Sequence, residues 1–360
     1  MKLFFKLLVI LILLNPCLTL ASEKIFHVVK NEPSSDERAI AFVDTVTGKN
    51  RIVEVNMNGE VIWEWAFTNK LIANSYAICD GADINYLPSL DKFLFILPKF
   101  GAFIIGRDGQ PELVVKDNKI THDIDHLPNG NFIYVRGFAD KGEDELREIS
   151  PEGKVVWRWS HADYFPNRED FYEIYNKDQI KQLYKSGTLK ENNKDWAHVN
   201  GVERLDNGDT LISVRNFNMF VIVNSKGRPK KVFKNIHRVH EPHRVKSGYI
   251  ASDRRRTANK LLNSVIFISN EDERKYLLTG KFKSIRGIQE LKEGRFYITS
   301  VGNIFEIDAE ANIFHRMHLT IDKEDSERDL TSKDLKERRL FGKGRCAKGT
   351  GNLYKVVKTK

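Results

Sequence analysis

Residues 195–215 have the sequence DWAHVNGVERLDNGDTLISVR, and the pattern they contain decides how the chain folds. A polar turn at residues 206–208 separates two short runs of apolar residues, which predicts a β-hairpin. His198 and Asn200 stand at the start of the first expected strand, and Arg215 stands at the end of the second. Because these two ends of a hairpin lie at one edge, we expect the three polar side chains to face one patch.

Hairpins of this kind recur along the chain, for example HDIDHLPNGNFIYVR from His122, HEPHRVKSGYIASDRR from His240 and RGIQELKEGRFYITSV from Arg286. A second pattern, in which a four-residue turn joins two apolar strands, occurs six times. Its turns end at residues 59, 109, 153, 227, 272 and 311, which are 50, 44, 74, 45 and 39 residues apart. A unit of about 45 residues with four short strands is typical of a propeller blade. The sequence therefore predicts an all-β fold, a six-bladed β-propeller.

The expected propeller spans residues 22–360, and the segment ERAIAFVD supplies a strand of its first blade. Either IFHVVK near the start or GNLYKVVKTK at the end completes the closing blade. The long spacing marks an insertion at about residues 160–193, between blades three and four, where apolar residues recur at helical intervals. This predicts a helical insertion, which serves as a lid, a surface decoration or a dimer contact. The basic tail, about residues 333–360, is expected to be a solvated loop before the last strand.

The first 21 residues have the features of a secretory signal peptide, with Lys2 and Lys6 before a short apolar run and small residues. No apolar run is long enough for a stable membrane span after cleavage. We therefore expect a periplasmic protein. Outside this segment the chain has Cys79 and Cys346, which either form a disulfide in that compartment or remain free thiols.

The formal net charge is +9, and two of these charges leave with the signal peptide. A basic exported protein is expected to meet anionic small molecules or membrane surfaces rather than nucleic acid. We predict small-molecule ligands, no nucleic-acid partner and no cofactor.

Aligned on their turn glycines, the hairpins share one position eight residues before the glycine. It is occupied by His122, Asn200, His240 and Arg286. In a propeller this position starts the innermost strand of a blade, so several blades aim a nitrogen-bearing side chain at one axis. His198 lies two residues before Asn200, and Arg215 and Arg255 each lie seven residues after a turn glycine. A packed interior would be apolar, so this register predicts a functional site.

Clustered histidines suggest zinc as one alternative. However, Arg215 and Arg286 at the same place would repel a cation. Histidine together with arginine suits an anion with several oxygen atoms, such as sulfate or phosphate. We therefore predict an anion site without a metal.

The stretches DWAHVNGV and NGDTLISVRNFN, HDIDHLPNGN, and HEPHRV with GYIASD resemble the bacterial arylsulfate sulfotransferases over about residues 40–320. The specific part is the combination H-x-N followed by S-x-R. The resemblance implies a periplasmic six-bladed propeller that moves a sulfuryl group from a phenolic sulfate ester to a phenolic acceptor. It also implies that no nucleotide sulfate donor is used.

Carried over by position, the resemblance implies that His240 is the nucleophile and becomes sulfated in a ping-pong reaction. His198 and Arg215 would hold the equatorial oxygens of the sulfuryl group. His122 would protonate or hydrogen-bond the departing phenolate, although which histidine is the acid stays open. Asn200, Arg255 and Arg286 are expected to bind substrate.

Larger members of the family carry an N-terminal β-sandwich domain that has no counterpart in this sequence, so the resemblance is to a short form. The oligomeric state stays open. Two other classes of function also stay open: a non-catalytic propeller that binds an anionic or aromatic ligand in the same channel, and a scaffold for protein partners.

Overall fold

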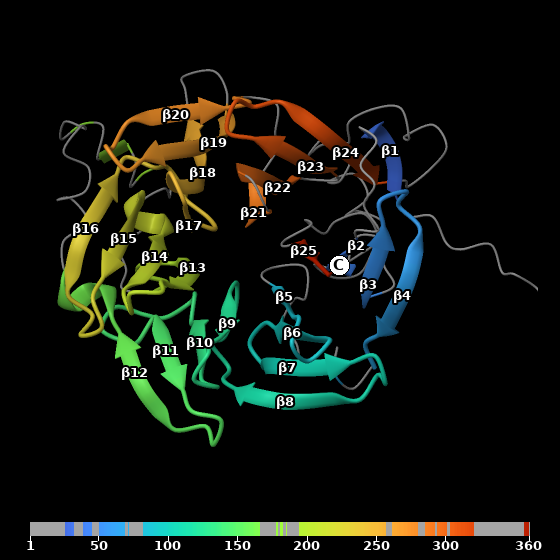
Figure 1. The fold of residues 1–360 in the computed structure, drawn as a ribbon. Coiled ribbons are helices and arrows are strands. Elements are labelled where there is room, and N and C mark those ends of the chain that lie inside the picture. The colour runs from blue at the N-terminus through green and yellow to red at the C-terminus, as the bar shows by residue number, and fades with distance from the viewer. Residues whose placement is uncertain are drawn as a thin grey trace, which may run out of the picture.

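Six antiparallel sheets form a ring in the computed structural model of the chain (Figure 1). The structure describes residues 26–31, 39–44, 50–68, 71, 82–165, 178, 181–182, 185, 194–256, 261–279, 285–291, 294–300, 303–319 and 356–359. The innermost strand of each sheet faces the centre of the ring, and the other strands follow outward in order. The predicted six-bladed β-propeller is confirmed.

The blades follow one another around the ring, and the strands of each blade are named from the innermost to the outermost. Blade one has β25 (Val357–Lys358), β2 (Ala39–Asp44), β3 (Arg51–Asn56) and β4 (Val61–Ala66). Blade two has β5 (Ile84–Leu87), β6 (Lys92–Leu97), β7 (Gly101–Gly106) and β8 (Pro111–Lys116). Blade three has β9 (Ile124–His126), β10 (Phe132–Val135), β11 (Leu146–Ile149) and β12 (Val155–Trp159).

The second half of the ring has the same plan. Blade four has β13 (Val199–Arg204), β14 (Thr210–Val214), β15 (Met219–Val223) and β16 (Pro229–Lys234). Blade five has β17 (His243–Val245), β18 (Gly248–Arg256), β19 (Leu261–Ser269) and β20 (Arg274–Leu277). Blade six has β21 (Ile285–Glu290), β22 (Arg295–Ser300), β23 (Asn303–Asp308), β24 (Ile313–Leu319) and β1 (Phe26–Asn31).

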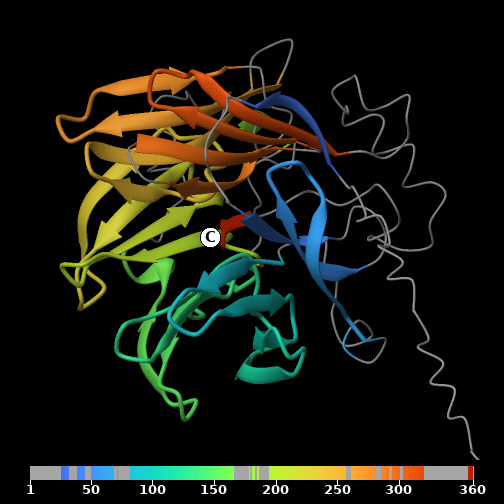
Figure 2. The same cartoon turned by 45° about the vertical axis from the view of Figure 1, so that its right-hand side comes forward.

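Both candidate closing segments are used, but in different blades. β25 supplies the innermost strand of blade one and pairs with β2, while β1 pairs with β24 as a fifth strand of blade six. Figure 2 shows the C-terminal strand in the middle of the ring, next to β2. Since an unpaired strand edge is a liability, each terminal strand covers an edge that would otherwise be open.

Burial explains why the strands have these sequences. Middle strands such as β2 and β7 are buried at every position, because they pack against a neighbouring blade on both faces. The outermost strand β4 alternates between half-buried and exposed residues. Its Trp65 donates to the carbonyl of Gly109 in the next blade, at 3.1 Å, and Trp159 of β12 donates to Gly227 in the same way, at 3.0 Å. These two hydrogen bonds join the outer strands of blades one and three to a turn of the following blade.

The innermost strands are joined to one another by side chains. An acceptor on one inner strand binds a backbone N–H of the inner strand in the next blade, so that this inward-facing donor is paired. The pairs are Asp83 with Ile124, Asp123 with Val202, Glu203 with Arg244, and Gln289 with Lys358. They hold neighbouring inner strands at fixed positions relative to one another around the ring.

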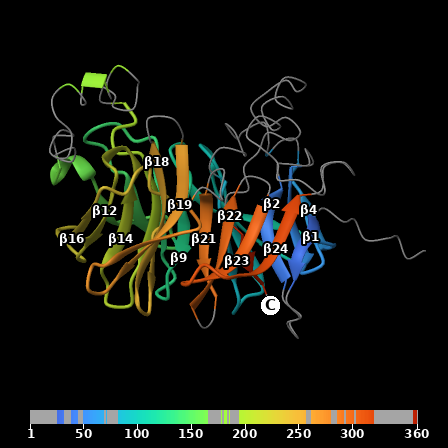
Figure 3. The ribbon, with the colours of Figure 1, turned by 90° about the horizontal axis from the view of Figure 1, so that it is seen from above.

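The predicted helical insertion at about residues 160–193 is not supported. Within it, the structure describes a 3-10 turn, η1 (His161–Asp163), and helical positions at residues 178, 181, 182 and 185. The rest of the expected insertion lies outside the described residues, except for residues 160, 164 and 165. Figure 3 shows the ring from the side, with η1 at its edge.

Several expectations concern segments outside the described residues. They are the signal peptide at 1–21, Cys79 and Cys346, and all of the tail at 333–360 except residues 356–359. Within the part of the chain that the structure does describe, no helix is long and apolar enough to cross a membrane.

A buried carboxyl group in blade three gives a pH-dependent contribution to stability. Glu145 is 1% exposed and accepts a hydrogen bond from the backbone N–H of His161 at 2.7 Å. Burial raises the pKa of Glu145 from 4.5 to about 8. Because the pKa of Glu145 is higher in the folded protein than in the unfolded chain, protonation of Glu145 favours the folded state. This contribution to the free energy of unfolding is complete below about pH 4.5 and is lost as the pH rises through about 8.

We expect Glu145→Gln, which imitates the protonated acid, to be more stable than the wild type at pH 9 by roughly 4 kcal/mol, and nearly equal at pH 5. Thermal unfolding at both pH values measures this. Glu152→Gln, at an exposed turn of the same blade, is the matched control and should keep the wild-type pH dependence. An unchanged pH dependence in Glu145→Gln would contradict the assignment of a protonated Glu145.

Candidate active site

Blades three to six each place a polar side chain at one end of the ring. His122 lies two residues before β9, His198 directly precedes β13, His240 lies three residues before β17, and Arg286 is the second residue of β21. The ring centroids of His122 and His198 are 5.2 Å apart, and Nη1 of Arg286 lies 2.9 Å from Nε2 of His240. Since residues of different blades meet in this way, the structure brings the predicted histidines and Arg286 into one site.

The backbone at this site is unusual. His122 and His198 have φ angles of +72° and +49°, and Arg238 and Glu241, on either side of His240, have +49° and +45°. The left-handed region is unfavourable for residues other than glycine and costs of order 1 kcal/mol or more each. The surrounding strands therefore hold these residues in place against their own preference.

The imidazole of His240 has a defined tautomer. Its Nδ1 lies 2.8 Å from the carbonyl oxygen of Arg238, which only accepts, so Nδ1 carries the hydrogen and Nε2 carries the lone pair. The backbone N–H of His240 donates to Oγ of Ser252 at 2.9 Å, which fixes the residue to β18. Burial, and then the charges of Arg286 and Arg215, hold the pKa of His240 well below its usual value. His240 thus presents a neutral ring whose Nε2 accepts a hydrogen bond from Arg286.

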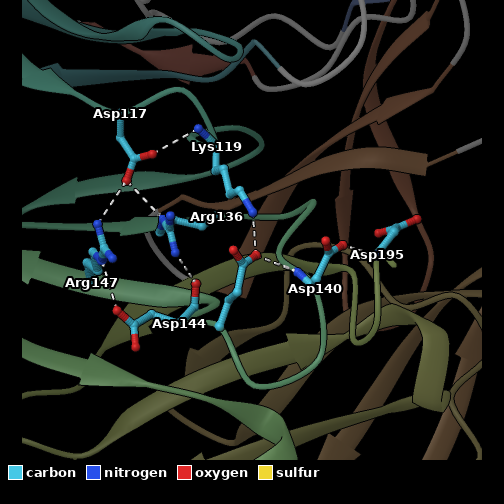
Figure 4. Close-up of polar contacts among 8 residues, drawn as sticks. Asp117, Lys119, Arg136, Asp140, Asp144, Arg147 and Asp195 are labelled. Atoms are coloured by element: carbon cyan, nitrogen blue, oxygen red, sulfur yellow. Dashed lines mark hydrogen bonds and ion pairs between the residues drawn. The ribbon is translucent and has the colours of Figure 1, made fainter. Parts of the chain in front are cut away.

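A carboxylate orients His198. Nδ1 of His198 lies 2.7 Å from Oδ1 of Asp195, so the Asp195 carboxylate accepts this N–H and Nε2 is the ring nitrogen left for the site. The backbone N–H of Asp195 donates to Oδ1 of Asp140 at 3.1 Å, and that of Asp140 donates to Glu143 at 2.8 Å. Figure 4 shows Asp195 at one end of this chain of polar contacts, which continues through Lys119 to Asp117.

An aromatic ring lies beside the two histidines. The ring centroid of Phe138 is 5.8 Å from that of His122 and 5.5 Å from that of His198, and Nζ of Lys99 lies 5.1 Å from the same ring. Burial, and then the charges of His198, Arg286 and Arg215, hold the pKa of His122 well below its usual value. His122 is therefore a neutral ring next to the apolar ring of Phe138.

Arginines surround the histidines. The pKa of Arg215 is lowered to about 10 by burial and then by the charges of Arg238 and Arg286. The pKa of Arg254 is lowered to about 10 by burial and then by the same two neighbours. Positive charge is therefore concentrated at this end of the ring, as an anion site requires.

Arg255, which the sequence predicted to bind substrate, does not join this group. Its Nη2 lies 3.2 Å from Asp253, and its guanidinium lies over the ring of Tyr276, 4.5 Å from the centroid. Its neighbour Arg254 faces the site instead, because successive residues of a strand point to opposite sides.

Asn200 is buried in β13, where its Oδ1 accepts a hydrogen bond from Ser213 at 2.6 Å. Its Nδ2 is also buried and has no hydrogen-bond partner among the described residues. The side chain therefore retains one donor for a ligand.

No group of three histidine, cysteine, aspartate or glutamate residues in the described ranges has the arrangement of a metal site. The groups that meet at this site are imidazole nitrogens and guanidinium groups, and guanidinium groups bind oxyanions.

Asp195, Phe138, Arg238 and Arg254 were not predicted from the sequence. Asp195 opens the hairpin stretch 195–215, and its position three residues before His198 was the available signal. Phe138 and Arg238 lie in connecting segments, where strand periodicity gives no orientation.

Comparison with known proteins agrees with this geometry. The sequence model of the arylsulfotransferase (ASST) family matches residues 104–232, which confirms the resemblance to this family over that segment. The match includes His122, His198, Asn200 and Arg215, while His240 and Arg286 follow it in the chain. No curated protein sequence matches.

Among solved structures, the chain is similar to a protein of unknown function from Bacteroides caccae, with 12% identity and a TM-score of 0.54, over 90% of this chain and 99% of that one. It is also similar to a gluconolactonase from Xanthomonas campestris, with 7% identity and a TM-score of 0.47, over 83% and 89%. A virginiamycin B lyase from Staphylococcus aureus has 12% identity and a TM-score of 0.44, over 83% and 90%. At these identities the first likeness supports the propeller fold alone.

Proposed function

We propose that this protein transfers a sulfuryl group from a phenolic sulfate ester to a phenolic acceptor, through a sulfated His240 and without a nucleotide donor. The observation that carries the proposal is the lone pair on Nε2 of the buried, neutral His240, next to Arg286 and within the field of Arg215. The family match over residues 104–232 supports the same reaction class.

In the first step, Nε2 of His240 attacks the sulfur atom, an N–S bond forms, and the bond from sulfur to the phenolic oxygen breaks. Arg286 and Arg215 donate to the sulfuryl oxygens, so that charge in the loose transition state is neutralised by groups already in place. Arg286 exchanges its hydrogen bond to Nε2 for one to the substrate when the substrate binds.

We assign proton transfer to His198. The Asp195 carboxylate at 2.7 Å stabilises a proton on this ring, whereas burial and nearby charges hold the pKa of His122 low. His198 gives its proton to the departing phenolate. In the second step the acceptor phenol loses its proton to His198 while its oxygen attacks sulfur, and the N–S bond breaks. His122 donates a hydrogen bond as a neutral ring.

The test is turnover of a chromogenic aryl sulfate by the purified protein, with and without phenolic acceptors. We expect release of the chromogenic phenol that depends on the acceptor. Tight binding of the aryl sulfate without release, with every one of several phenols, would instead support a non-catalytic propeller that binds an anion.

The pH profile gives a second readout. Because burial and two arginines lower the pKa of His240, the reactive neutral form persists well below pH 6.5. We expect kcat/KM of the wild type, which reports the free enzyme, to show no fall centred near pH 6.5 as the pH is lowered, and to fall through protonation of His240 only at lower pH. A fall already centred near pH 6.5 or above would contradict a neutral, buried His240.

We also propose that the protein is exported to the periplasm, on the basis of the charged and apolar pattern of residues 1–21. Secretion of a fusion that carries these residues, compared with one in which the apolar run is replaced by serines, tests this.

A further inference from the structure

Blade five contributes two arginines beyond those that the sulfuryl group needs. The backbone carbonyl of Arg238 accepts the Nδ1–H of His240, so Arg238 lies in the loop that carries the nucleophile. Arg254 lies on β18, two residues after Ser252, whose Oγ binds the backbone of His240. Alternate residues of a strand share a face, so Arg254 lies on the His240 side of β18. Its backbone N–H donates to the carbonyl of His237 at 2.7 Å.

Arg254 also lies farther out than His240. β18 and β19 continue beyond the other strands of blade five, with Arg254 opposite Asn263, whereas the pairing of β19 with β20 ends at Val265. Figure 3 shows these two strands extending past their neighbours. Two residues of extended strand span about 7 Å, so Arg254 stands roughly one aromatic ring beyond the level of Ser252.

Neither guanidinium is neutralised by the protein. No hydrogen bond or ion pair joins the side chain of Arg238 or Arg254 to another residue in the described ranges, and Nε of Arg254 is buried. Asp253, which precedes Arg254 in β18, accepts the N–H of His237 and pairs with Arg255, and Asp195 binds His198. Crowded, partly buried positive charges without a partner are costly unless a ligand supplies negative charge.

A monoanionic aryl sulfate carries too little negative charge to balance the four arginines at this end of the ring. Its three free oxygens are served by Arg215, Arg286 and the histidines, which leaves Arg238 and Arg254. The fork of a guanidinium matches a carboxylate or a sulfate in a bidentate contact. We propose that Arg238 and Arg254 form a second anion subsite, and that the preferred donor is an aryl sulfate with a second anionic group across the ring. This inference rests on the proposed function.

The experiment compares matched donors: 4-carboxyphenyl sulfate, hydroquinone bis-sulfate, and the neutral isostere 4-carbamoylphenyl sulfate. We expect kcat/KM of the wild type to favour the two dianions over the amide by at least about tenfold, a typical effect of one charge-assisted contact. The two dianions show whether carboxylate or sulfate fits better.

Arg254→Gln and Arg238→Gln should each remove most of this preference, measured as the ratio of kcat/KM for the dianions to kcat/KM for the amide in the same variant. Arg255→Gln removes the same charge from the opposite face of β18 and should keep the preference. Equal kcat/KM for all three donors in the wild type, or a preference that survives both substitutions, overturns the second subsite.

Failure of the proposed function gives a different result. If no donor is turned over, binding of 4-carboxyphenyl sulfate and of its amide is measured by calorimetry with the same variants. Tighter binding of the dianion that is lost in Arg254→Gln but kept in Arg255→Gln supports the subsite without catalysis. Equal binding of the two compounds overturns it.

Discussion

His240→Asn abolishes transfer: we expect kcat for an aryl sulfate and a phenol to fall by at least about 10³-fold, as for loss of the nucleophile in other covalent mechanisms. Asparagine retains an amide near Arg238 but has no ring nitrogen to attack sulfur. Steady-state release of the chromogenic phenol measures the loss. The wild type should also show a burst of one phenol per protein without an acceptor, which the variant lacks.

The matched control is His126→Asn. His126 ends the inner strand β9 of blade three, is exposed, and contacts Phe132 rather than the site, with ring centroids 5.1 Å apart. We expect its kcat to stay within about twofold of the wild type. Turnover in His240→Asn at the wild-type rate would show that the nucleophile lies elsewhere.

Asp195→Asn has the second largest expected effect. The amide that replaces the carboxylate offers Nδ1 of His198 either a donor or an uncharged acceptor, so the ring loses its fixed tautomer and its stabilised proton. Loss of the analogous carboxylate from a catalytic triad lowers kcat by about 10⁴-fold, and we expect a loss between about 10² and 10⁴ for this protein.

The loss should be smaller with a donor whose phenolate is a good leaving group, because that phenolate needs no proton. A merely structural role for Asp195 would lower turnover equally for all donors. Asp206→Asn, in the exposed turn of blade four, is the control and should leave all donors unaffected. Full activity of Asp195→Asn would contradict the assignment of His198 as the acid.

The propeller could be predicted because each blade repeats the same physical requirement. A hairpin needs a turn that permits a positive φ, and the turn glycines at 109, 153 and 227 meet it with φ angles of +73°, +81° and +79°. The middle strands of a blade need apolar residues on both faces, so the repeats are visible without any long-range information. The helical insertion occurs once and has no repeat to support it, and most of its residues lie outside the described part of the chain.

The site residues that could be predicted from the sequence are those at the ends of inner strands, because these positions repeat from blade to blade. Counting eight residues back from the turn glycine selected His122, His240 and Arg286, which the structure brings to one end of the ring, and His198 lies two residues before the Asn200 that the same count selected. Blade five differs, because Val245 pairs with Gly248 across a two-residue turn, whereas Arg204 and Thr210 of blade four flank a five-residue turn. Arg215 also lies beyond the end of β14, in a 3-10 turn (Arg215–Phe217), whereas Arg255 lies within β18, so equal counts from the two glycines do not give equivalent positions.

Residues from connecting segments could not be placed in this way. Asp195, Phe138 and Arg238 reach the site through loops whose direction depends on left-handed residues, including Asp195 and Arg238 themselves, with φ angles of +51° and +49°. A pattern of apolar and polar residues contains no signal for such bends, since aspartate adopts the left-handed region at only some positions and arginine does so only rarely.

The most direct test of the account is to find the covalent intermediate. The wild-type protein is mixed with an aryl sulfate in the absence of a phenol, digested, and its peptides are examined by mass spectrometry. We expect one added sulfuryl group on His240, which disappears when a phenol is supplied and never forms in His240→Asn. A sulfuryl group on another residue, or continued turnover with no modified peptide at all, would contradict it.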